Sequence, residues 1–215
     1  MSAPLYEHLL AYSKQNRISF AMPGHKNGRG LKKDLLSLDV TELSATENLI
    51  HPGEYVLKAQ ELLSNLYGSD KSYILTGGST SAIHSMICAG VKPGGTLLSA
   101  GDCHMSVINT CALLGINLKL FPKEIDSSFS VPKGTGTLKE YLTDDIDAVI
   151  ITSPNYYGIC SDIKNTAEEC HAKNIPLLVD EAHGAHFIAS NLFPQTAVKY
   201  ADAVCQSAHK TLNAM

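Results

Sequence analysis

Residues 177–186 have the sequence LLVDEAHGAH, in which three apolar residues are followed directly by two carboxylates and then by small residues and histidines. A short, wholly apolar run of this kind is typical of a strand that is covered on both faces, as in the parallel sheets of α/β proteins. Asp180 would then stand at the carboxyl end of a buried strand, where such sheets collect their ligands. The segment therefore predicts both a fold class and the edge of the sheet that carries the chemistry.

The same pattern repeats on both sides of this segment, with short apolar runs separated by stretches of helical spacing. The runs predict strands at Tyr73–Leu75, Thr96–Ser99, Asn117–Phe121, Ala148–Thr152, Leu177–Asp180 and Ala203–Gln206. Helices are expected at Pro4–Gln15, Glu54–Leu66, Thr80–Ala89, Ser106–Leu114, Thr137–Leu142 and Ile163–Lys173. Right-handed crossovers would place helices on both faces of a mainly parallel sheet, a three-layer α/β/α fold. We expect residues 1–50 to form a helix and a Gly-rich loop (Met22–Gly30), and residues 51–215 to form the α/β domain.

Composition and charge exclude several classes of protein. The chain has 215 residues, 44% hydrophobic and 18% charged, and its net charge of -4 is spread without a basic stripe for nucleic acid or membrane. The apolar runs are too short to span a bilayer, and no secretory signal is visible, so we expect a cytoplasmic protein with a small-molecule partner. The six cysteines form no C-x-x-C pair, which favours reduced, buried thiols.

Three predicted strand ends carry groups that suit a ligand. The segment Thr76–Ala82 runs through two glycines and three hydroxyls into a helix, an arrangement that suits a phosphate but also an ordinary helix cap. His104 follows the strand at Leu97 and Leu98, where its ring would stack on an aromatic cofactor or simply cap the next helix. Thr152–Gly158 is a polar turn for which functional and structural interpretations are equally good.

The carboxylate of Asp180 needs a partner, because a buried charge is costly unless a cation or hydrogen-bond donors meet it. A protonated pyridine nitrogen is one such cation. Asp180–His183 also spells the letters of a helicase DEAH box, but no phosphate loop of the form G-x-x-x-x-G-K-[ST] precedes it. His183 and His186 lack the further ligands of a metal site, and we predict none.

The last strand end, Ser207–Thr211, adds Lys210, whose amine can form an imine with an aldehyde. Lys210 alone would be interpreted as a solvated lysine. Together with a phosphate cradle, a stacking ring and an acid for a pyridinium nitrogen, it completes the set of groups that pyridoxal 5'-phosphate requires.

The chain resembles the Orn/Lys/Arg decarboxylases, a family of fold type I pyridoxal-phosphate enzymes, in its shorter form without a wing domain. The resemblance rests on Met22–Lys26, Asp39–Leu43, Gly78–Ser81, Asp102–His104, Asp180–His186 and Ser207–Leu212, in the family's order. It implies that Lys210 carries the cofactor, that Asp180 pairs with the ring nitrogen, and that His104 stacks on the ring. It further implies phosphate contacts from Gly78, Ser79, Thr80 and Ser207, with His183 beside the ring and His209 near the phosphate or in proton transfer.

The family releases carbon dioxide from basic amino acids, so the resemblance implies decarboxylation of arginine, lysine or ornithine by a homodimer or higher homo-oligomer. Another fold type I reaction, such as transamination or a lyase reaction, and cofactor binding without turnover remain alternatives. The chain ends five residues after Lys210, so we expect a fragment with an incomplete cofactor-binding domain. Glu42 and Glu47 are candidates for binding the distal cation of the substrate, and helix capping is the competing interpretation.

Overall fold

The computed structural model describes residues 47–214. The chain divides into two compact units: one comprises Val40–Ser207, and the other comprises Met1–Asp39 together with Ala208–Met215. The first unit contains the sheet. The described part of the second unit is a short segment with one helix, α6 (Ala208–Thr211).

Several predictions fall on the residues before Glu47. The predicted first helix, the Gly-rich loop Met22–Gly30 and Glu42 all lie outside the described residues. The division of the chain near residue 50 therefore stays a prediction.

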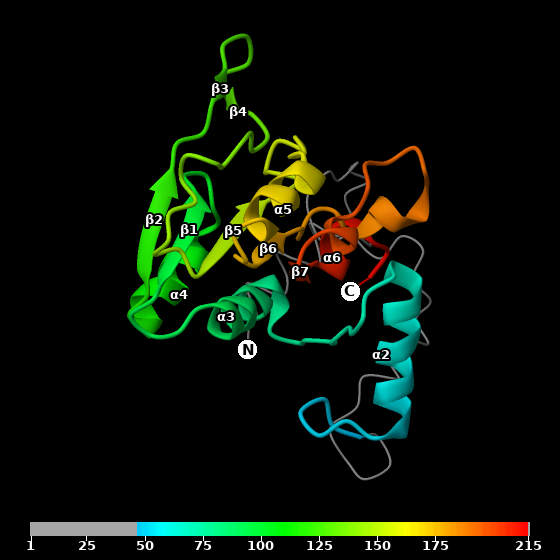
Figure 1. Ribbon diagram of the computed structural model, residues 1–215. Helices are drawn as coiled ribbons and strands as arrows, with labels where there is room; N and C mark the ends of the chain where they lie inside the picture. The colour runs from blue at the N-terminus through cyan, green and yellow to red at the C-terminus, as the bar shows by residue number, and fades with distance from the viewer. Residues whose placement is uncertain (1–46, 215) are drawn as a thin grey trace, which may run out of the picture. The chain divides into compact units, whose positions relative to one another are not determined.

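A five-stranded parallel sheet forms the centre of the first unit (Figure 1). Its strands are β1 (Thr96–Ala100), β2 (Asn117–Phe121), β5 (Ala148–Thr152), β6 (Leu177–Asp180) and β7 (Ala203–Cys205), in the spatial order β2-β1-β5-β6-β7. All four pairings are parallel. The predicted mainly parallel α/β sheet is therefore confirmed, and five of the six predicted strands are present within one residue of their expected ends.

Both faces of this sheet are covered, which explains why its central strands are apolar without alternation. On β5, Val149 and Ile151 pack into one cluster with α5 (Ile163–His171), while Ala148 and Ile150 pack into a second cluster. That second cluster includes side chains of α3 (Gly78–Gly90) and α4 (Met105–Leu114). Each fully buried Val or Ile side chain contributes roughly 1.5–3 kcal/mol. The three-layer α/β/α arrangement follows from this two-sided burial.

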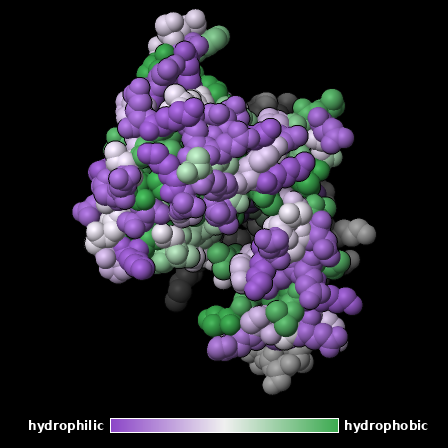
Figure 2. Space-filling model, viewed as in Figure 1, coloured by the Kyte–Doolittle hydropathy of each residue, from purple (hydrophilic) through white to green (hydrophobic). Residues whose placement is uncertain are grey.

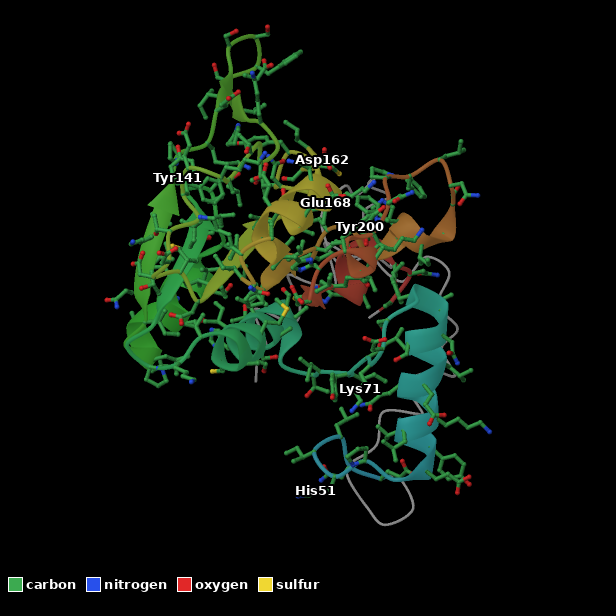
Figure 3. All side chains as sticks on the ribbon, in the orientation of Figure 1. His51, Lys71, Tyr141, Asp162, Glu168 and Tyr200 are labelled. Atoms are coloured by element: carbon green, nitrogen blue, oxygen red, sulfur yellow. The ribbon has the colours of Figure 1, made fainter. Side chains whose placement is uncertain are left out.

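Helix ends follow local signals in the sequence. Asp162, labelled in Figure 3, precedes α5. Its side chain accepts a hydrogen bond from the backbone N–H of Asn165 at 3.1 Å. The helix α2 (Glu54–Tyr67) ends at Gly68, as the sequence predicts, because Gly68 adopts the left-handed conformation with φ 73°. At the start of α2, both carboxylate oxygens of Glu47 accept backbone N–H groups, from Tyr55 at 2.9 Å and Val56 at 2.8 Å. This contact supports the capping interpretation of Glu47.

Two predicted elements are wrong. Tyr73–Leu75 is not a strand, because none of the strands in the described residues pairs with it, and all three side chains are exposed. Thr137–Leu142 forms a turn in place of a helix. The Glu169 carboxylate accepts hydrogen bonds from the Thr137 hydroxyl at 2.7 Å and the Leu138 N–H at 2.6 Å, and this holds the segment against α5.

The remaining elements are short and were not predicted. They are the antiparallel pair β3 (Ile125–Asp126) and β4 (Val131–Pro132) and the 3-10 helices η2 (Ala185–Ala189) and η3 (Ala197–Lys199). The β3–β4 hairpin extends away from the central sheet in Figure 1. None of the helices in residues 47–214 is long and apolar enough to cross a membrane.

All six cysteines are free thiols, as expected. Their predicted burial holds for Cys111, Cys170 and Cys205, whereas Cys88 is exposed and the other two are half-buried. Burial raises the pKa of the Cys170 thiol to about 12, with smaller contributions from nearby carboxylates. Cys170 is therefore an inert core residue rather than a nucleophile.

Candidate functional site

Several elements of the first unit meet at the carboxyl edge of the sheet. Thr152, Asp180 and Cys205 are register neighbours, so the ends of β5, β6 and β7 are level. The Cys205 thiol donates a hydrogen bond to the carbonyl oxygen of Ser79 at 3.5 Å, which brings the first turn of α3 to this edge. Because Asp180 lies beside Cys205 on the adjacent strand, the start of α3 and the Asp180 carboxylate share one end of the sheet.

The loop between β1 and α4 reaches the same edge. Burial raises the pKa of the Cys103 thiol, and the negative charges of Asp102 and Asp180 add to the increase. β1 runs parallel to β5, so the loop that follows β1 leaves the sheet at the same carboxyl edge. His104 follows Cys103 directly and belongs to this same loop.

Asp180 is a buried acid at this edge. Only 4% of the residue is exposed, and its Oδ1 accepts a hydrogen bond from the Ala182 N–H at 3.1 Å. A carboxylate this deeply buried is costly unless a cation or hydrogen-bond donors meet it. The position suits a protonated ring nitrogen and fits the pairing that the sequence predicts.

The first turn of α3 provides donors for an anion. Gly77 precedes the helix and provides no side-chain cap, Ser79 is half-buried, and Gly78 and Thr80 are exposed. Gly78 has φ 71°, a conformation that side chains rarely adopt, so the turn favours glycine there. Uncapped N–H groups, two hydroxyls and the positive end of the helix suit a phosphate.

His104 is the N-cap of α4, and this contact fixes its tautomer. The ring Nδ1 accepts a hydrogen bond from the Ser106 N–H at 3.2 Å and lies 2.8 Å from the Ser106 hydroxyl. A backbone N–H can only donate, so Nδ1 carries no proton, and the neutral ring holds its proton on Nε2. The structure therefore shows the capping role that the sequence allowed, and stacking of the ring on a cofactor stays a prediction.

Lys123 is a buried lysine that was not predicted from the sequence, and it contacts the loop between β1 and α4. The Lys123 ammonium lies 3.8 Å from the Asp102 carboxylate and donates a hydrogen bond to the Thr135 hydroxyl at 3.1 Å. Its side chain is only 6% exposed, and burial lowers its pKa although Asp102 acts in the opposite direction. Lys123 follows the end of β2, so inspection of that strand end would have found it.

Replacement of Lys123 by Met is expected to lower the free energy of unfolding by about 2–4 kcal/mol, because it leaves the Asp102 carboxylate without its cation in a mostly buried position. Urea denaturation measures the change. Lys119→Met is the matched control, since the Lys119–Asp145 pair is closer, at 2.7 Å, but about half exposed and screened by solvent, so its loss should cost clearly less than the loss of Lys123. Equal losses in the two variants would contradict the role of Lys123.

Glu181, the residue after Asp180, holds neighbouring segments together. It is 1% exposed and accepts hydrogen bonds from the Thr196 hydroxyl, the Ala197 N–H and the Gln206 amide at 2.6–2.7 Å. Burial raises its pKa, although these bonds act in the opposite direction. These contacts join the ends of β6 and β7 to η3, so Glu181 stabilises the loops at the carboxyl edge of the sheet.

The turn after β5 brings aromatic rings to His183. The rings of Tyr156 and His183 meet edge to face, with 6.3 Å between centroids. Asn155 organises the turn itself, because its side-chain oxygen accepts the N–H groups of Tyr157 and Ile159, both at 3.0 Å. Asn155 therefore has a structural role, and His183 lies where it can flank a ligand at the end of β6.

The last three predicted site residues, Ser207, His209 and Lys210, are divided between the two units. Ser207 is 4% exposed and follows β7 in the first unit. His209 and Lys210 lie on α6, in the second unit. Their approach to Asp180 and His104 stays a prediction. Within residues 47–214, there is no group of three or more His, Cys, Asp or Glu side chains that could hold a metal ion.

Comparison with known proteins identifies the relatives of this chain. The family model for the major domain of Orn/Lys/Arg decarboxylases matches residues 3–215. An uncharacterized protein of Bacillus subtilis, YaaO, is 42% identical over the whole chain, and an arginine decarboxylase of Halalkalibacterium halodurans is 30% identical over 96% of it. The chain spans 47% and 45% of these two proteins, about half the length of the curated relatives that it matches.

The fold is shared with solved pyridoxal-phosphate enzymes of fold type I. A lysine decarboxylase from Francisella novicida superimposes with a TM-score of 0.65 at 22% identity. The match covers 96% of this chain and 33% of that protein. The predicted fold class is confirmed.

Proposed function

Because the chain belongs to the Orn/Lys/Arg decarboxylase family, we propose that its protein converts arginine, lysine or ornithine to the amine and carbon dioxide with pyridoxal 5'-phosphate as cofactor. Named relatives that match 96% of the chain at 30% identity are arginine decarboxylases. The activity is proposed for the whole protein, because the chain spans about half the length of these relatives.

One observation carries the proposal: Asp180 is buried at the end of β6, on the sheet edge that also receives the first turn of α3. An acid for a ring nitrogen and donors for a phosphate are what a phosphorylated pyridine requires, and they stand at the same edge. The residues present therefore fit the cofactor that the family implies.

Each residue at this edge has a distinct task in the proposed reaction. Bound pyridoxal phosphate supplies the electron sink for the electrons of the broken Cα–carboxylate bond. The Asp180 carboxylate keeps a proton on the ring nitrogen, while the α3 turn with Gly78, Ser79 and Thr80 binds the phosphate. His104 provides its ring face for stacking, with a proton held on Nε2.

The remaining assignments come from the family. Lys210 would carry the cofactor and, after the carboxylate leaves, return a proton to Cα, with His209 beside it as a second proton donor or phosphate ligand. Ser207 would add a phosphate contact. His183 would flank the ring near its phenolic oxygen, supported by the edge-on ring of Tyr156.

We extend the proposal to the setting of the enzyme. It would act in the cytoplasm as a homodimer or higher homo-oligomer, and its diamine or agmatine product would enter polyamine biosynthesis. No nucleic acid or membrane is required for this chemistry.

The proposal is tested by incubating the purified full-length protein with pyridoxal phosphate and separately with arginine, lysine and ornithine. We expect release of carbon dioxide together with the matching amine. One of the three amino acids should react faster than the other two. Formation of a keto acid would indicate transamination. A visible absorption band from bound cofactor without any product would indicate a binding protein and would refute the proposed activity.

A further inference from the structure

A buried cation lies beside the loop that carries His104. Charged side chains usually lie at the surface of a protein, and the face shown in Figure 2 is mostly hydrophilic. The side chain of Lys123 is only 6% exposed, although it lies just beyond β2, an edge strand of the sheet. Lysine is rarely buried to this extent unless an opposite charge meets it, and Asp102 provides that charge here. Neither residue is among those proposed to bind the cofactor.

The loop from Gly101 to His104 is short and is held at both ends. The Gly101 N–H donates a hydrogen bond to the carbonyl oxygen of Phe121, the last residue of β2, at 3.0 Å. The Cys103 N–H donates to the carbonyl oxygen at the end of β1 at 3.1 Å, and His104 caps α4. Asp102 lies between these contacts, so a shift of its side chain would be passed to His104 through a constrained turn.

The Asp102 carboxylate depends on Lys123 for its position. Its side chain is 19% exposed, and within residues 47–214 its Oδ1 has no hydrogen-bond partner. The Lys123 ammonium lies 3.8 Å from Oδ2, a distance at which the charges attract although no direct hydrogen bond forms. Solvent and salt screen this attraction less than they would at the surface. Lys123 is therefore the cation that holds the acidic side chain of the loop in its mostly buried position.

On its other side, Lys123 is linked to the end of β6. The ammonium donates a hydrogen bond to the Thr135 hydroxyl at 3.1 Å, and the Thr135 N–H donates to the Ser161 hydroxyl at 2.8 Å. The Ser161 N–H donates to the Ser153 hydroxyl at 3.0 Å, and the Ser153 N–H donates to the carbonyl oxygen of Asp180, also at 3.0 Å. These contacts connect the ammonium to the strand end that carries the buried acid, through segments that are distant in sequence.

A ring that stacks on a cofactor must be held to within about 0.5 Å of its working position relative to the other binding groups. We propose that Lys123 is a positioning residue, which holds Asp102 and thereby fixes the His104 ring relative to Asp180. The inference rests on the proposed function, because the ring and the acid are placed for pyridoxal phosphate. Lys123 acts through the loop and does not touch the cofactor.

Titration of the full-length protein with pyridoxal phosphate, followed by the visible absorbance of the bound cofactor, tests this role. Lys123→Met should raise the dissociation constant about tenfold, since loss of a supporting residue commonly weakens binding by that factor. Two control variants should bind like the wild type. Lys119→Met removes the half-exposed lysine of β2, and Ile175→Ala weakens the core before β6, at the opposite edge of the sheet, where the isoleucine is 6% exposed.

Asp102→Asn separates positioning from simple charge attraction, and it decides the case in which Lys123→Met fails to fold. The cofactor is an anion, so removal of a nearby negative charge would strengthen its binding if charge alone mattered. Positioning predicts the opposite result, a dissociation constant about tenfold higher. In a His104→Ala background, Lys123→Met should raise the dissociation constant no further, because its effect passes through that ring.

Several outcomes would overturn the inference and leave the proposed function intact. They are wild-type affinity in folded Lys123→Met, unchanged or tighter binding by Asp102→Asn, and an undiminished effect of Lys123→Met in the His104→Ala background. Equal weakening in Ile175→Ala would also overturn it, since lost stability alone would then explain the lower affinity. A full-length wild type that binds no cofactor would overturn the proposed function and the inference together.

Discussion

The Lys210→Ala protein is expected to lose all cofactor that borohydride can fix covalently. In the wild type, incubation with pyridoxal phosphate followed by borohydride should attach the cofactor to the Lys210 side chain through a stable secondary amine. Alanine offers no amine for that bond. Decarboxylation should fall by roughly 10²–10⁴-fold or more, since the same residue is proposed to return a proton to Cα. Absorbance of the reduced adduct and mass analysis of the labelled peptide measure the result.

Two other lysines sharpen this test. Lys199 is exposed on η3, and Lys199→Ala should retain full trapping. Lys123 is the strongest competitor, because burial lowers its pKa and favours the nucleophilic free amine. Undiminished trapping in Lys210→Ala would refute the assignment, and label on the peptide that contains Lys123 would identify the residue responsible.

The central strands that the sequence predicts correctly are buried on both faces. β5 and β6 are buried throughout most of their length, so continuous apolar runs identify them without knowledge of the neighbours. Tyr73–Leu75 has a similar composition, but a strand also needs a paired neighbour, and that depends on tertiary structure. Leu138 and Leu142 have helical spacing and are both buried, yet the Glu169 carboxylate binds the start of the segment and leaves a single turn.

The residues of the candidate site also fall into those that the sequence predicts and those that it does not. The positions of Asp180 and His104 follow from the rule that ligands meet parallel sheets at the carboxyl ends of strands, and both residues are at such ends. The supporting residues do not follow from it. Glu181 and Lys123 act through Thr196, Gln206, Asp102 and Thr135, which are distant in sequence and close only in the fold. A sequence pattern therefore locates the reacting edge better than the network that holds it.

Glu181→Ala is expected to be the most destabilising substitution near this edge. The alanine would leave the Thr196 hydroxyl, the Ala197 N–H and the Gln206 amide without their acceptor in a buried position. Unsatisfied buried donors cost about 1–3 kcal/mol each, and partial relaxation would bring the total to roughly 3–5 kcal/mol. Urea denaturation followed by circular dichroism measures it. Glu168→Ala serves as control, since that side chain is 66% exposed and pairs with Lys164 at 3.9 Å, so its loss should cost less than about 0.5 kcal/mol.

The pH dependence of stability provides a second measure of Glu181, through comparison with Glu181→Gln. Burial raises the pKa of Glu181 above its ordinary value of 4.5, so between these two values the folded protein binds more protons than the unfolded chain. Its contribution to stability is therefore largest below pH 4.5, declines as the pH rises through the folded pKa, and is constant above it.

Glu169 has the opposite slope, because hydrogen bonds from Leu138, Thr137 and Asn165 outweigh its burial and lower its pKa. Since Glu169 is present in both proteins, its effect cancels in the difference between wild type and Glu181→Gln. That difference in unfolding free energy should fall with rising pH, and a flat or rising difference would show that the Glu181 carboxylate is not held in the environment described.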